Sequence, residues 1–117
     1  MTITRIDTNE RMSQAVIHGD TIYLAGQVAI DAGGKSVTEQ TTNILSRIDN
    51  LLEQSGADKS KLLTATIWLT NMDDFDEMNS VWDSWVPSGD APARACVESR
   101  LAFPQFTVEI SVTASRN

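Results

Sequence analysis

Two segments of this chain repeat with a period of two residues, and no other feature constrains the fold as much. Residues 63–70 read Leu-Thr-Ala-Thr-Ile-Trp-Leu-Thr, and residues 106–113 read Phe-Thr-Val-Glu-Ile-Ser-Val-Thr. This period places alternate side chains on opposite faces of a strand, so we predict two strands that each bury one face. The second face of the later strand carries only Thr, Glu and Ser, so we expect one sheet face without a helical cover.

Further strands are predicted near both ends of the chain. Residues 14–18 and 21–24 flank Gly19-Asp20, a two-residue hairpin signal, and a further short strand is expected near Ile3. Residues 91–98 form another strand, and we expect it to pair antiparallel with 106–113 across a short loop at 102–105.

Two helices are predicted between these strands. Apolar residues recur at helical spacing from Thr38 toward Gly56, and a second amphipathic segment runs from Asp73 to Trp85, before Pro87. The element order β-β-α-β-α-β-β indicates an α+β fold, a mixed sheet with two helices packed on one face. Self-association through the other face would hide it from solvent.

Length and composition limit the kinds of protein this can be. The 117 residues fit one domain, 1–117, and the net charge of −7 argues against nucleic acid or an anionic membrane surface as a partner. There is no apolar segment long enough to suggest a signal peptide or a membrane span, so we expect a cytoplasmic location. With one histidine and one cysteine, the chain is expected to hold no transition metal.

Arg94 and Glu109 are the most informative candidate site residues, because each places a charge inside a strand pattern. Each is either exposed to solvent or part of a site. The expected hairpin sets Glu109 opposite Glu98, about 13 Å along the strand from Arg94 at about 3.3 Å per residue. One small ligand could not reach both within one hairpin, so joint action would require a subunit interface.

Other side chains give weaker signals. Cys96 has no neighbouring histidine and is interpreted as a small buried residue, and His18 as a surface residue. Asn79 is interpreted as satisfying backbone groups at a helix boundary. The backbone at Ala25-Gly26 could present amides to an anion. The stripe formed by Trp82 and Trp85 is interpreted as core.

The segment Pro92-Ala93-Arg94-Ala95-Cys96-Val97-Glu98, followed by Val108-Glu109-Ile110, resembles the signature of the reactive-intermediate deaminase (RidA/YjgF) family. Ala25-Gly26-Gln27, Asp74-Phe75 and Asn79 add to the resemblance, which spans about residues 12 to 114. Met12 and Ala25 stand where typical deaminases have tyrosine and serine. The chain thus looks like a divergent branch that keeps the arginine.

The resemblance implies a chorismate mutase-like fold and a homotrimer with clefts between subunits. It also implies cofactor-independent hydrolysis of enamines and imines, such as 2-aminoacrylate, to 2-oxo acids and ammonia. Arg94 would then bind the substrate carboxylate and Glu109 would hold or activate water. Further substrate contacts would come from Cys96, Gly26, Asn79, Met12 and Ala25.

Three functions remain open from the sequence. The first is an enamine or imine deaminase, favoured by Arg94 together with Glu109. The second is a non-catalytic module that binds small carboxylates such as 2-oxo acids, favoured by Met12 and Ala25. The third is an interaction or chaperone-like protein without a small-molecule site.

Overall fold

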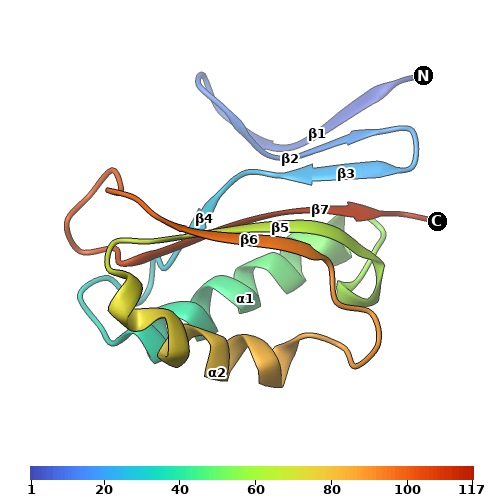
Figure 1. Ribbon diagram of the computed structural model, residues 1–117. Coiled ribbons are helices and arrows are strands. Elements are labelled where there is room, and N and C mark those ends of the chain that lie inside the picture. Colours follow the sequence, from blue (N-terminus) through green and yellow to red (C-terminus); the bar gives the residue numbers. More distant parts are fainter.

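The computed structural model describes residues 1–117 and confirms the α+β fold class (Figure 1). One mixed sheet has the strand order β1-β2-β3-β7-β5-β6, and the short β4 also pairs with β7. The strands are β1 (Ile3–Thr8), β2 (Ser13–His18), β3 (Thr21–Leu24), β4 (Gln27–Val28), β5 (Leu62–Leu69), β6 (Ala93–Glu98) and β7 (Val108–Ser115). The helices are α1 (Val37–Gln54) and α2 (Phe75–Trp85), with short 3-10 turns at Lys59–Lys61 and Met72–Asp74.

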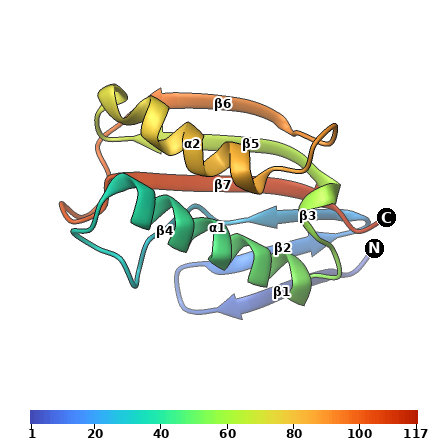
Figure 2. The ribbon, with the colours of Figure 1, turned by 90° about the horizontal axis from the view of Figure 1, so that it is seen from below.

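Both helices cover the same face of the sheet, as expected. Seen from below, α1 lies against β7 and β4 while α2 runs beneath β5 and β6 (Figure 2). The core between these layers is one cluster of 22 buried residues. The opposite face has no helix on it, and β1 and β2 rise on that side (Figure 1). This helix-free face is called the open face below.

The helix ends follow the signals in the sequence. Ser36 caps α1, because its hydroxyl accepts a 3.1 Å hydrogen bond from the Glu39 amide. Gly56 follows the helix with a φ of +85°, a backbone conformation that favours glycine. The hairpin signal at Gly19-Asp20 is also confirmed, because β2 pairs antiparallel with β3 through His18 and Thr21.

The expected hairpin between the last two strands is wrong. β5 lies between them and pairs in parallel with β6 and antiparallel with β7. Residues 99–107 connect β6 to β7 across the end of β5. There the amide of Ser99 donates a hydrogen bond to the carbonyl of Leu69, and the amide of Thr70 donates one to the carbonyl of Thr107. A connection of this length does not enforce a tight turn, and β5 and β6 instead form a β-α-β unit through α2.

Two details of the strands also differ from the sequence pattern. Leu62 rather than Leu63 is buried at the start of β5, because the register with β7 shifts between Leu62 and Thr64. The two-residue strand β4 was not predicted, since Gly26 interrupts the pattern before it.

No helix combines the length and apolar character needed to span a membrane.

Candidate active site

Arg94 lies on the edge strand β6, on the face that the helices cover. Its neighbour in β5 is Ala65, which is buried beneath the helices, so the two side chains share that face. The guanidinium carbon is 5.4 Å from the ring centre of Trp82 and 5.9 Å from that of Phe75. Nη1 donates a 2.7 Å hydrogen bond to Oδ1 of Asn79. These contacts orient an exposed guanidinium whose remaining donors are available to a ligand. Asn79 lies inside α2, so its interpretation as a residue that satisfies backbone groups at a helix boundary is wrong.

Cys96 follows Arg94 on the same face of β6. The side chain is half-buried and packs against the edge of the core. Partial burial raises the pKa of the Cys96 thiol, and the positive charge of Arg94 offsets only part of that rise. The thiol is therefore neutral at physiological pH and is a poor nucleophile.

Glu109 lies on the open face, in the middle of the sheet. It pairs with Trp68 of β5 and Val28 of β4. Partial burial raises the pKa of the Glu109 carboxyl, and no side-chain hydrogen bond within the chain compensates for it. The carboxylate lies against the backbone of Gly26, where a Cβ atom would clash with Oε2. A side chain at position 26 would therefore have to displace this carboxylate.

Ala25 directly precedes Gly26 after the end of β3, and Met12 directly precedes β2. The amide of Ala25 donates a 2.9 Å hydrogen bond to the Gln14 carbonyl, which joins the strand end of β3 to β2. Met12 closes the turn between β1 and β2, where its amide donates to Oδ1 of Asn9, and its side chain is 42% exposed. Met12 is therefore exposed at this turn, whereas Ala25 is half-buried.

Within one chain the predicted residues thus form two separate groups. Arg94, Asn79 and Cys96 lie at the β6 edge on the helix side, whereas Glu109 and Gly26 lie on the open face. Glu109 is in register with Trp68 and hence with Val97, three residues from Arg94 and two strands away. At about 3.3 Å per residue and about 4.8 Å per strand, the two backbones are about 14 Å apart. The distance between Arg94 and Glu109 is therefore close to the expected one, although the two strands do not pair with each other as expected.

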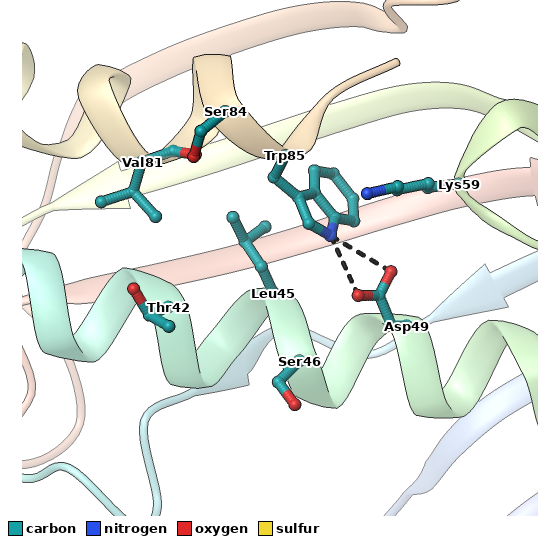
Figure 3. A pocket seen from close by; sticks show the side chains of 8 residues that line it. All are labelled: Thr42, Leu45, Ser46, Asp49, Lys59, Val81, Ser84 and Trp85. Carbon is teal, nitrogen blue, oxygen red and sulfur yellow. Dashed lines mark hydrogen bonds between the residues drawn. The ribbon is translucent and has the colours of Figure 1, made fainter.

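Hollows occur in the single chain away from both groups. One of about 300 Å³ lies between α1 and α2, where Nε1 of Trp85 donates to both carboxylate oxygens of Asp49 at 3.1 Å and Lys59 lies over the indole (Figure 3). The Asp49 carboxylate and the Trp85 indole satisfy each other there, and neither predicted catalytic residue lines the hollow. A smaller polar hollow of about 120 Å³ is lined by Gln14, Gln27, Arg47 and four neighbours. Neither contains Arg94 or Glu109.

Some contributors to the site were not predicted from the sequence. Phe75 and Trp82 form the aromatic support of Arg94, although Trp82 was interpreted only as core. The interpretation of Trp82 and Trp85 as packing residues holds, because Trp82 belongs to the core cluster and Trp85 packs against it. Helical spacing puts Phe75, Asn79 and Trp82 on one face of α2, and that was the available signal. No group of three or more potential metal-ligating side chains occurs in the structure.

A two-layer chain of this topology, with an oriented arginine at one edge and a half-buried glutamate on an open face, defines a class of small protein that is recognisable by comparison. A family model described as Endoribonuclease L-PSP matches residues 2–116. A RutC family protein from Haemophilus ducreyi is 48% identical over 98% of this chain and 97% of its own length. RutC family protein YoaB from Escherichia coli is 45% identical over 98% of this chain and 99% of its own.

The solved structures agree. A crystal structure of a member of the YjgF protein family from Neisseria meningitidis superposes with a TM-score of 0.96 at 44% identity, covering 100% of this chain and 97% of that one. This protein therefore belongs to the RidA/YjgF family, also named RutC and L-PSP. Its fold is the chorismate mutase-like fold of that family.

Proposed function

We propose that this protein hydrolyses reactive, carboxylate-bearing enamines and imines to 2-oxo acids and ammonia. The observation that carries the proposal is the state of Arg94, an exposed guanidinium held by Trp82, Phe75 and Asn79 in a protein of net charge −7. Asn79 is its only side-chain hydrogen-bond partner, so the planar fork is free to bind a carboxylate through two parallel hydrogen bonds.

Glu109 supplies the second part of the chemistry. Water adds to the imine carbon, and the resulting carbinolamine expels ammonia as the C=O bond forms. A carboxyl whose pKa is raised by burial takes a proton from the attacking water and delivers one to the leaving nitrogen more effectively than an ordinary carboxylate. Positioning the imine by its carboxylate beside this water accounts for the rest of the rate increase.

A complete site requires a second copy of the chain. Arg94 and Glu109 face opposite sides of one sheet, so a cleft that uses both joins the β6 edge of one subunit to the open face of another. Such a contact is heterologous, and it forms a closed ring when the rotation between neighbouring subunits closes. We propose a homotrimer with three clefts. Ala25, Met12 and the backbone at Gly26 would line each cleft from one subunit, with Asn79 and Cys96 from its neighbour.

The test couples a threonine dehydratase or an amino-acid oxidase to this protein and follows the disappearance of imine. Wild-type protein should accelerate the loss, and Arg94→Ala should reduce kcat/KM by about 100-fold or more, since it removes a charge-assisted bidentate contact. Arg94→Lys should recover only part of the rate. The matched control is Arg100→Ala, which removes an exposed positive charge just beyond β6. No acceleration by wild-type protein over several imines would overturn the proposal.

The second candidate is a binder of small carboxylates without catalysis. It is favoured by the exposed Met12 and by Ala25, neither of which can orient water as a phenol or a hydroxyl could. Calorimetry with pyruvate or 2-oxobutanoate distinguishes the two functions. Saturable binding that Arg94→Ala abolishes, without any imine hydrolysis, would identify the binder. Absence of both binding and hydrolysis would leave an interaction protein.

A further inference from the structure

The joint between β3 and β4 contains one extra residue. Tyr23 pairs with Thr113 and Gln27 pairs with Ile110, so four steps along β3 and β4 face three steps along β7. This is a β-bulge, and Gly26 lies in it beneath the Glu109 carboxylate. The conformation of the bulge therefore determines what the backbone presents to the open face.

The bulge is held by Gln27, a fully enclosed polar side chain that is 2% exposed. Its Nε2 donates to Oε1 of Gln14 at 2.9 Å and to the carbonyl of Ala25 at 3.0 Å, and its Oε1 accepts from Nε of Arg47 at 3.4 Å. Gln27 pairs with the buried Ile110, so this network lies on the helix side of the sheet. Burying a side-chain amide is unfavourable unless it forms hydrogen bonds. The hydrogen bonds of Gln27 join the bulge, through the Ala25 carbonyl, to Gln14 of β2 and Arg47 of α1.

The Gln27 network determines the direction of the next amide. The Ala25 carbonyl is drawn toward the helix side, and every peptide bond is trans, so the Gly26 N–H points the opposite way, toward the open face. That N–H has no hydrogen-bond partner within the chain. On the other side of the bulge, the Ser111 hydroxyl donates a 3.0 Å hydrogen bond to the Leu24 carbonyl. The Gly26 N–H is thus a fixed donor beside Glu109.

We propose that Gln27 is a positioning residue, which orients the Gly26 N–H and the Glu109 carboxylate from the opposite face of the sheet. Under the proposed function, this donor is the substrate contact at Gly26 that the family resemblance implies. This inference rests on the proposed function, but the geometry that it predicts is measurable without activity. Gln27 itself touches no substrate.

The test replaces Gln27 by methionine, which keeps the length and removes all three hydrogen bonds. The matched control is Gln40→Met. Gln40 is also completely buried and makes three hydrogen bonds to backbone, but these go to Lys35, Gln105 and Thr107 rather than to the bulge. Both variants should lose stability to a similar extent, as measured by urea unfolding. Gln27→Glu is a second variant, which keeps the acceptor for Arg47 and loses the donors to Ala25.

Two readouts decide the proposal. In ¹⁵N-resolved NMR, Gln27→Met should shift the Gly26 amide signal and the titration midpoint of the Glu109 carboxyl, whereas Gln40→Met should leave both near their wild-type values. In the coupled imine assay, Gln27→Met should lower kcat by about 10- to 100-fold, the range expected from a small misplacement of reacting groups.

An unchanged Gly26 amide and Glu109 titration in both Gln27 variants would overturn the positioning role, whether or not wild-type protein is active. Equal effects of Gln27→Met and Gln40→Met on these signals would also overturn it, because the role would then be general stability. Inactive wild-type protein with the predicted NMR changes would refute the proposed reaction and keep the positioning role.

Discussion

At the scale of single residues, the contact between Gly26 and Glu109 is the tightest constraint in the site. Gly26 has no positive φ, so an alanine there is not strained by its backbone, and its Cβ would displace only the carboxylate above it. We expect Gly26→Ala to stay folded and to lower kcat/KM for imine hydrolysis by about 10- to 100-fold.

The double variant tests this interpretation of the Gly26 contact. If displacement of the carboxylate is the cause, Gly26→Ala should add little to the loss already seen in Glu109→Gln. Fully additive losses in the coupled assay would show that Gly26 acts independently of Glu109.

Glu109 should also affect stability in a pH-dependent way. Desolvation raises its pKa in the folded state above the ordinary value near 4.5, so its contribution to stability is largest below that value and declines as pH rises through the folded pKa. The neutral variant Glu109→Gln should therefore gain Tm relative to wild type at pH 7 and lose that gain near pH 4. Glu10→Gln, in the exposed β1–β2 turn, is the control. A gain of equal size at both pH values would contradict the assignment.

At the scale of elements, the sequence predicted the strands and helices better than their neighbours in space. Alternation in 106–113 was a reliable guide, because burial of one sheet face imposes a period of two whatever the strand order. Which strand lies beside β7 depends on tertiary packing, and the parallel β5–β6 pair left no local signal. The same limit applies to the site. Arg94 and Glu109 could be picked out from the sequence as candidate site residues, but only the pairing of β5 with β6 and β7 shows that they lie on opposite faces of the sheet.

The two helices are joined by a polar contact on their outer side. Trp85 of α2 donates from Nε1 to Asp49 of α1, as Figure 3 shows. Trp85→Phe should reduce the free energy of unfolding by about 1 kcal/mol, the usual net value of such a bond, with little change in imine hydrolysis. Urea denaturation measures the loss. Asp49→Asn in the Trp85→Phe background should add almost nothing, and a full additional loss would show that Asp49 stabilises the protein by another contact.

At the scale of the whole molecule, the open face should be the contact between subunits. Thr66 and Ser111 are neighbours at its centre, and their short side chains allow close approach. Thr66→Lys should convert the assembly to monomers in sedimentation experiments and abolish imine hydrolysis although Arg94 is untouched. Ser46→Lys, on the exposed outer side of α1, is the control and should remain assembled. Wild-type protein that sediments as a monomer at micromolar concentration would contradict the proposed assembly.

Because Arg94 and Glu109 lie on opposite faces of one sheet, the fraction of intact clefts in a mixture of two variants can be calculated. If each cleft takes its arginine from one subunit and its glutamate from the next, Arg94→Ala and Glu109→Gln subunits can repair one another. The two variants are mixed in equal amounts, unfolded and refolded together. A cleft is then intact when the subunit that supplies Arg94 is the Glu109→Gln variant and the subunit that supplies Glu109 is the Arg94→Ala variant. Random assembly meets each condition half the time, so two inactive proteins should together regain about one quarter of wild-type activity. A mixture that stays inactive would mean that each chain builds its site alone.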